Sequence, residues 1–188
     1  MEVKKWAEES PSADRVRPAS CSRCGAASRP PGEPLVLVSH GLRERQVRGP
    51  AGPTEEPETR VVRVRRYRCQ RCGGLTTVLP RGLTARRHYS ASAIGLALCL
   101  HGLRGLSVGE TRQRVCTWPV GFETERWTTL LSWVVAIRQG RLFPRVRPAL
   151  PTASLRSRAE RAAATLCSVS LSGGGIEVQV FEGAALAA

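Results

Sequence analysis

The sequence of 188 residues predicts an α+β protein in which a small cysteine-bearing β domain precedes a helical domain. Two observations predict this class. Two Cys-x-x-Cys pairs flank a segment rich in β-branched residues, and helical spacing of apolar residues begins after Pro80. The expected organisation is a flexible leader over residues 1–18, the β domain over 19–80, the helical domain over 81–142, and a linker with a poorly ordered C-terminal segment over 143–188.

The two cysteine pairs predict a metal site. Cys21 and Cys24 form the first pair, and Cys69 and Cys72 form the second. Four thiolates from two tight turns are the ligand set of a closed structural Zn²⁺ site, so we expect a zinc ribbon. Disulfides and unliganded thiols are alternatives, as is a four-thiolate iron site. His40 as a replacement ligand is a further, less favoured one.

The residues between the two pairs predict two strands and a turn. Segments 35–38 and 61–67 are rich in β-branched and aromatic residues, and the second runs directly into Cys69. Residues 49–58 contain three prolines and two glycines, which favour a flexible hairpin tip. Because this domain has few apolar residues, we expect its folding to depend on the metal.

Three helices are expected in the second domain. The first covers about 90–101, with Ser90 or Ser92 as its N-cap and Gly102 at its end. The second begins at the capping box Ser107–Glu110, and the third runs from about 123 to 139 and stops at Gly140. Three helices with short turns favour a trihelical helix-turn-helix domain, and a helical bundle that merely packs is the alternative.

The C-terminal segment gives weaker signals. Residues 154–167 are rich in alanine and arginine and are compatible with a helix, whereas 176–180 alternate in a way that suggests a strand without a partner. We therefore expect this segment to be poorly ordered. Residues 173–175, all glycine, lack the Lys-Ser/Thr of a phosphate loop and are interpreted as a hinge.

The charge predicts a polyanionic partner. Of 29 basic residues, only Lys4 and Lys5 are lysines, and the isoelectric point is near 11.0. Such a surplus of arginine favours phosphate backbones, most simply double-stranded DNA. The candidate DNA contacts are all arginines on the last expected strand, the interdomain linker and the expected helices: Arg63, Arg65, Arg66, Arg68, Arg86, Arg87, Arg112, Arg114 and Arg126. An acidic protein or a lipid surface is the alternative partner.

Several motifs together resemble the N-terminal zinc-ribbon and helix-turn-helix region of bacterial insertion-sequence transposases. They are the two Cys-x-x-Cys-Gly turns, the segment 40–45, and the segment 103–112. The resemblance covers about residues 21–140 and implies recognition of terminal inverted repeats. In such proteins a separate RNase H-like domain cuts DNA with acidic residues and divalent metal. Here Asp14 is the sole aspartate, so no catalytic centre is expected.

We therefore expect a non-enzymatic, zinc-stabilised DNA-binding protein, with a zinc-dependent protein-interaction adaptor as the alternative. A second copy of the chain or a transposition partner protein are further partners to consider. The N-terminus lacks the layout of a signal peptide, and the apolar runs are too short to span a bilayer. We expect a cytoplasmic, nucleoid-associated protein whose seven cysteines stay reduced.

Overall fold

The computed structural model describes residues 3–117, 127–147, 149–150 and 152–188, and has the expected α+β class. The chain forms two compact units. The first contains residues 1–46 and 61–80, and the second contains 47–60 and 81–188. One boundary between the units falls after Pro80, and residues 47–60, which lie within the expected ribbon segment 19–80, belong to the second unit. Among the helices of the described residues, none is both long and apolar enough to cross a lipid bilayer.

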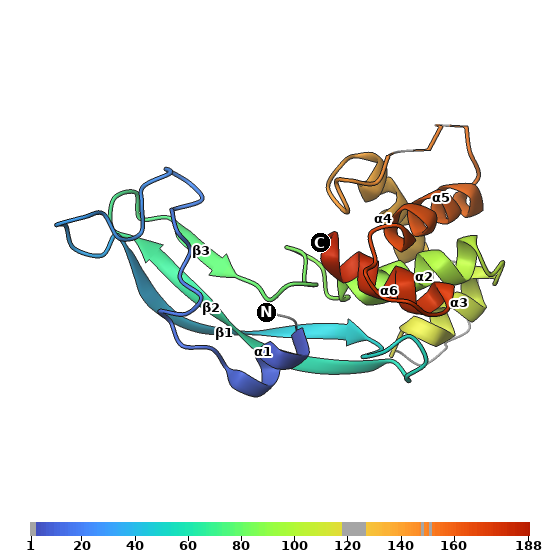
Figure 1. Cartoon of the computed structure of the whole chain (residues 1–188), viewed down its shortest axis with the longest axis horizontal. Coiled ribbons are helices and arrows are strands. Elements are labelled where there is room, and N and C mark those ends of the chain that lie inside the picture. The colour runs from blue at the N-terminus through green and yellow to red at the C-terminus, as the bar shows by residue number, and fades with distance from the viewer. Residues whose placement is uncertain (1–2, 118–126, 148, 151) are drawn as a thin grey trace. The chain divides into compact units, whose positions relative to one another are not determined.

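A three-stranded antiparallel sheet organises the first unit (Figure 1). The strands β1 (Leu37–Gly49) and β2 (Glu58–Cys69) form a long hairpin, and β3 (Leu75–Val78) pairs with β2 from Arg65↔Val78 to Arg68↔Leu75. The predicted strand at 61–67 is confirmed and extends at both ends, whereas β1 begins at Leu37 and shares only two residues with the predicted segment 35–38. β3 follows the second cysteine pair directly, so the sheet holds both sides of that turn.

The leader is not flexible, as the sequence suggested, but bound to β2. Helix α1 (Val3–Glu9) carries Trp6, which is 3% exposed and donates from Nε1 to the carbonyl of Arg63 at 2.9 Å. Arg65 Nε donates to the Pro11 carbonyl at 2.9 Å, and the Tyr67 hydroxyl donates to the Ala13 carbonyl at 2.5 Å. Side chains two residues apart on a strand point to one face, so Arg65 and Tyr67 both reach the leader, and Arg63 adds a contact through its backbone carbonyl. We call residues 3–18 the leader strap.

Helix α2 (Ala91–Gly102) is the centre of the second unit, and every residue from Ala91 to His101 is buried. It packs against α3 (Val108–Val115), α4 (Thr128–Arg138), α5 (Leu155–Cys167) and α6 (Ile176–Leu186) (Figure 1). Ser90 caps α2, and Ser107 and Glu110 form the predicted capping box of α3. Gly140, with φ +67°, follows α4 as expected. The predicted start of the third helix, 123–127, lies mostly outside the described residues.

The C-terminal prediction is wrong in two respects. Residues 155–167 and 176–186 are well-formed helices packed on α2, not a poorly ordered tail, and the expected strand at 176–180 is the start of α6. Val180, Gly183, Ala184 and Ala187 recur at helical spacing and are all buried. Close packing therefore outweighs the β-propensity of the valines. A Cβ added at Gly183 would lie 1.9 Å from the Leu166 carbonyl oxygen, so α5 and α6 nearly touch.

The hairpin tip, residues 47–60, is anchored within the helical unit. The backbone N–H of Arg48 donates to the His88 carbonyl at 2.7 Å, and the Ser90 N–H donates to the Arg48 carbonyl at 3.1 Å. Gly49 adopts φ +111°, and a Cβ there would lie 2.3 Å from the Cβ of Ala93. Only glycine allows this approach to α2 without strain. The tip is therefore a fixed part of the second core rather than a free excursion.

Candidate metal centre and basic surface

The four cysteines of the two pairs come together at one end of the first unit. The ligand atoms of Cys21, Cys24, Cys69 and Cys72 all lie within 4.8 Å of one another. The Sγ atoms of Cys21 and Cys72 are 3.7 Å apart, as are those of Cys24 and Cys69. These separations are far longer than a disulfide bond, so the thiols are free. A tetrahedron with Zn–S bonds of about 2.3 Å has edges of about 3.8 Å, so the cluster can hold a tetrahedral ion.

The two cysteine turns repeat the same backbone geometry. The N–H of Gly25 donates to the Cys21 carbonyl at 2.9 Å, and the N–H of Gly73 donates to the Cys69 carbonyl at 2.9 Å. Gly25 has φ +71° and Gly73 has φ +69°, a region that glycine occupies without penalty. Each turn then returns to its start, because the N–H groups of Cys21 and Cys69 donate to the carbonyls of Ala26 and Gly74, both at 2.9 Å. Two copies of one turn thus present their thiols to a common centre.

Backbone N–H groups favour the thiolate form of the first cysteine in each turn. The N–H groups of Cys24 and Arg23 lower the pKa of Cys21 to about 6. The Cys72 N–H has the same effect on Cys69, whose pKa is also lowered. At Cys24 the Ala26 N–H acts in the same direction, but neighbouring thiols and burial outweigh it, and its pKa is raised to about 11. Four crowded sulfur atoms cannot all ionise without a cation between them, which is the electrostatic demand that a divalent metal meets.

The apolar core around this cluster is very small. Its buried members are Cys21, Val36, Leu37, Tyr67 and Cys69. Two of these five are themselves candidate ligands. The N–H of Gln70 donates to the Val36 carbonyl at 2.8 Å, which fixes the second turn against the segment preceding β1. His40 is exposed and is not part of the cluster.

Not all of the arginines predicted on β2 are equally available for a partner. Arg63 and Arg68 are exposed, and Arg63 lies 3.6 Å from the Glu44 carboxylate. Arg65 and Arg66 are half-buried, and Arg65 is bound to the leader strap. Among the predicted positions on β2, Arg68 therefore offers its guanidinium group most freely, and Arg63 is exposed beside Glu44.

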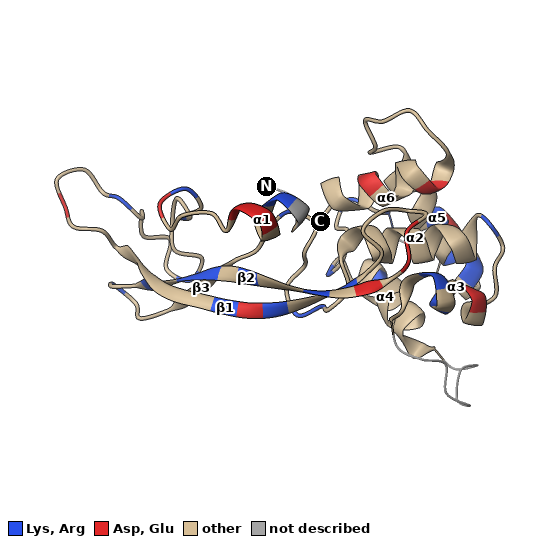
Figure 2. Cartoon of the chain, turned by 90° about the horizontal axis from the view of Figure 1, so that it is seen from below, with Lys and Arg blue, Asp and Glu red and all other residues tan. Residues whose placement is uncertain are grey.

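The predicted helical arginines are spread over the second unit. Arg86 is exposed in the segment before α2, and Arg87 is half-buried there, where burial and the charge of Arg141 lower its pKa. On α3, Arg114 is exposed and Arg112 is half-buried. Figure 2 shows basic positions along the hairpin and on α3. Arg126 lies outside the described residues.

Sequence reasoning overlooked two arginines at the candidate metal centre. Arg23 and Arg71 occupy the same position in the two turns, one residue before the second cysteine, and both are exposed. Arg71 forms an ion pair with Glu33 at 2.8 Å, whereas Arg23 lies against the turn of the other pair, since a Cβ on Gly74 would lie 3.1 Å from its Cδ. The repeated Cys-x-Arg-Cys pattern was the signal that would have identified them.

Comparison with known families gives one match. Residues 32–113 are similar to the family described as Domain of unknown function (DUF6431). This match covers less than half of the chain and runs from just before β1 to the last turn of α3, so it includes the second cysteine pair but not the first. No curated protein and no solved structure matches the chain.

Proposed function

We propose that this chain is a non-enzymatic DNA-binding protein in which Zn²⁺ stabilises the ribbon, and that it is a recognition module of transposase type from a bacterial mobile element. The observation that carries the proposal is the four-thiol cluster, with two Sγ–Sγ separations of 3.7 Å and all within 4.8 Å, on a unit rich in exposed arginine. Zn²⁺ would be held by Cys21, Cys24, Cys69 and Cys72 and would supply folding free energy, not chemistry.

The distribution of charge supports a partner that contacts both units. The first unit contains 13 Lys and Arg against 6 Asp and Glu, and the second contains 16 against 9, so each carries a net charge of +7. A globular protein that bound only one local acidic patch would not require such a surplus in both halves. A phosphate backbone can neutralise the positive charge of both units, because it presents negative charge continuously along its length.

The role proposed for each arginine group follows its exposure. Arg63 and Arg68 on β2 would contact phosphates, and Arg23 and Arg71 would extend that contact to the two cysteine turns. On the helical unit, the short helix α3 is capped at its N-terminus by Ser107 and carries Arg112 and Arg114 in its last turn. In this proposal phosphate contacts set the position of the protein, and a few groove contacts by helical residues set its sequence preference.

Metal analysis tests the first half of the proposal. Elemental analysis of the purified protein should find one zinc per chain, and Cys69→Ser should lose it. A visible absorbance band would instead indicate a four-thiolate iron site. Protein that is folded in its first unit but contains no transition metal would contradict the zinc assignment.

A salt series tests the second half. Fluorescence anisotropy with a labelled duplex should show log K falling linearly with log[salt], and each phosphate contact contributes a slope of about −0.9. Arg68→Gln should weaken binding, whereas Arg104→Gln, the matched control, should have little effect because Arg104 is already engaged with Glu177 at 2.9 Å. Affinity that does not change with salt would rule out the electrostatic mechanism.

The adaptor hypothesis has one observation in its favour. Large apolar side chains are exposed on the helical unit, including Leu131 on α4, which is 46% exposed. Such residues are common on single proteins, so they weigh less than the charge. Co-purification before and after nuclease treatment separates the two hypotheses: nuclease removes the partner of a DNA-binding protein and leaves a protein–protein complex intact.

A further inference from the structure

The two cysteine turns share a backbone geometry but differ in their surroundings. In the first turn Cys24 is exposed, whereas Cys72, its counterpart in the second turn, is half-buried. The residues that precede them differ as well. Arg71 is paired with Glu33 at 2.8 Å, and Arg23 forms no ion pair within the described residues. Cys24 is therefore the candidate ligand that combines access from solvent with a neighbouring cation whose charge is not offset.

The side chain of Arg23 lies close to the thiol cluster. An added Cβ at Gly74 would lie 3.1 Å from the Cδ of Arg23 and 3.2 Å from the Sγ of Cys72, so the stem of Arg23 runs beside the second turn. A nearby cation stabilises a thiolate, and exposed thiolates close to Lys or Arg are the cysteines most readily oxidised. The setting of Cys24 therefore favours its reaction with an oxidant.

A second thiol is positioned to complete such a reaction. The Sγ of Cys69 lies 3.7 Å from the Sγ of Cys24, and Cys69 is buried. A disulfide bond is about 2 Å long, so a movement of about 2 Å joins the two sulfur atoms. Cys24 thus has the properties of the attacked thiol, and Cys69 those of the resolving thiol.

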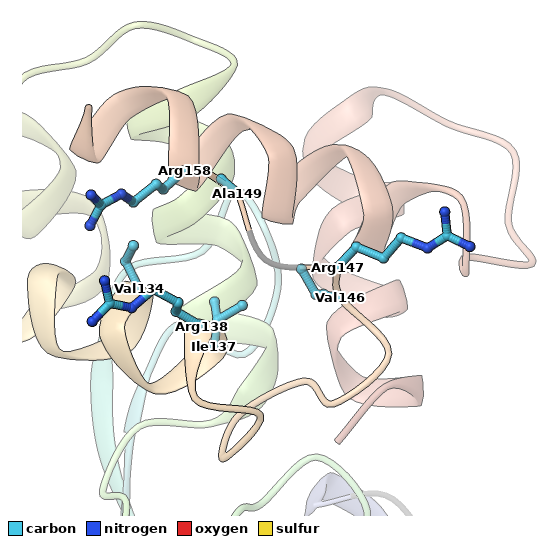
Figure 3. A pocket seen from close by; sticks show the side chains of 7 residues that line it. All are labelled: Val134, Ile137, Arg138, Val146, Arg147, Ala149 and Arg158. Atoms are coloured by element: carbon cyan, nitrogen blue, oxygen red, sulfur yellow. The ribbon is translucent and has the colours of Figure 1, made fainter. Parts of the chain in front are cut away.

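The three cysteines of the second unit lack this setting. Cys99 is buried. Cys116 accepts from the Tyr89 hydroxyl at 3.1 Å, and Cys167 donates to Oε1 of Gln179 at 2.8 Å. Arginines also gather in that unit, in the shallow hollow between α4 and α5 that Figure 3 shows, but none of these cysteines lines it. They therefore serve as internal controls for thiol reactivity.

We propose that the metal centre is an oxidation-sensitive switch, in which hydrogen peroxide oxidises Cys24, Cys69 closes a disulfide with it, and zinc is released. The Cys24 thiolate attacks one peroxide oxygen, the O–O bond breaks, and hydroxide leaves, which yields a sulfenic acid. The Cys69 thiolate attacks that sulfur, the S–S bond forms, the S–O bond breaks, and a second hydroxide leaves. Two thiolates thus give two electrons to the peroxide, and the cluster loses half of its ligands.

The switch acts on the part of the first unit that the proposed function assigns to DNA. Cys69 is the last residue of β2 and belongs to the five-residue buried cluster, and Arg68 precedes it directly. Oxidation should therefore disorder the end of β2 that carries Arg68 and weaken DNA binding. This effect on DNA and the release of zinc rest on the proposed function, whereas formation of the disulfide depends only on the thiol cluster.

The test uses the full-length, reduced, zinc-loaded protein in the absence of DNA. Zinc release after addition of hydrogen peroxide is followed with a chromogenic zinc chelator. Dimedone, which reacts with sulfenic acids, should label Cys24 before any other cysteine. Peptide mass spectrometry should then find the Cys24–Cys69 disulfide, with the three cysteines of the second unit still reduced. Duplex DNA affinity is measured separately, before and after oxidation.

Two matched variants test the asymmetry between the turns. Arg23→Gln should slow zinc release roughly fivefold, because it removes the cation beside the attacked thiolate, and Arg23→Lys should restore most of the rate. Arg71→Gln makes the same change in charge at the equivalent position of the second turn and should release zinc at close to the wild-type rate. Equal slowing by Arg23→Gln and Arg71→Gln would contradict first attack at Cys24.

The outcomes separate the switch from the proposed function. If zinc leaves and the Cys24–Cys69 disulfide forms, but the reduced protein does not bind duplex DNA, the switch stands and the proposed function fails. If the reduced protein binds DNA but keeps its zinc in excess peroxide, the proposed function stands and the switch is wrong. A disulfide that omits either Cys24 or Cys69 would also overturn the switch.

Discussion

The two units of this protein differ most in what their interiors contain. The first unit buries a five-residue cluster, two members of which are candidate metal ligands, together with Trp6, Val62 and Val64, whereas the second has a continuous apolar core built around α2. We therefore expect the first unit to bury too little apolar surface to fold without a metal, and the second to fold by burial alone. On the proposed zinc assignment, one chain combines two sources of stability, one from metal coordination and one from hydrophobic burial.

Removing the metal should give the largest difference in stability between the two units. Chelation, or Cys69→Ser, is expected to unfold the first unit and leave the second folded, because structural zinc contributes on the order of 10 kcal/mol to small domains. Hydrogen exchange resolved by segment would show β3 and the cysteine turns losing protection while α2 retains it. Cys99→Ser, a buried thiol outside the cluster, is the control that should keep the metal. Loss of protection in both units together would refute their independence.

A steric change in the second unit tests whether that unit can be destabilised without affecting the first. Gly183→Ala should destabilise the helical unit by about 1–3 kcal/mol or more, because its Cβ would collide with the Leu166 carbonyl oxygen at 1.9 Å. Gly173→Ala in the adjoining loop meets no atom within 4 Å and should be close to neutral. Denaturant melting gives the stability, and metal content should be unchanged in both variants. Loss of metal from Gly183→Ala would mean that the two units unfold together.

The capping box allows a smaller, local measurement. Ser107→Ala removes the hydroxyl that accepts from the Glu110 N–H at 3.2 Å, and should cost about 1 kcal/mol of the stability of the second unit. Ser107→Asp should restore most of it, because aspartate also caps helices. Equal destabilisation by both substitutions would show that the hydroxyl contributes something other than a cap.

The leader strap gives an expected effect as small as that of the cap, and it tests the description of the first unit. Tyr67→Phe removes the hydrogen bond to the Ala13 carbonyl and should cost about 1 kcal/mol. The readout is faster proteolysis of residues 3–18, with the metal retained. Unchanged proteolysis would mean that Trp6 and Arg65 alone hold the strap. Thr77→Ser, at an exposed position on β3, is the control and should leave proteolysis of the strap unchanged.

The features that sequence predicted well are those encoded over a few residues. Cysteine spacing identified all four members of the cluster, because the turn that presents two thiols needs only the pair and its glycine. Ser90, the Ser107–Glu110 box and Gly140 marked helix boundaries for the same reason: a cap is a local hydrogen bond or a local φ angle. These interactions do not depend on the rest of the fold.

The failures concern residues whose conformation is decided by distant contacts. Ile176 to Val180 alternate like a strand, and only their packing on α2 and α5 makes them helical. The leader contains few apolar residues, yet Trp6 is buried against β2, and the residues around Trp6 in the sequence give no indication of this contact. Whether the arginines of β2 contact DNA stays a prediction, and the strap already engages Arg65.

The division of the chain has a practical consequence for dissecting it. Because residues 47–60 belong to the second unit and interrupt the first, the polypeptide passes between units at three places, after residues 46, 60 and 80. A fragment beginning at residue 81 would lack the backbone hydrogen bonds of Arg48 and the close packing of Gly49 against Ala93. Separate expression of the helical half therefore requires a circularly permuted gene or the tip supplied as a peptide, not a single truncation.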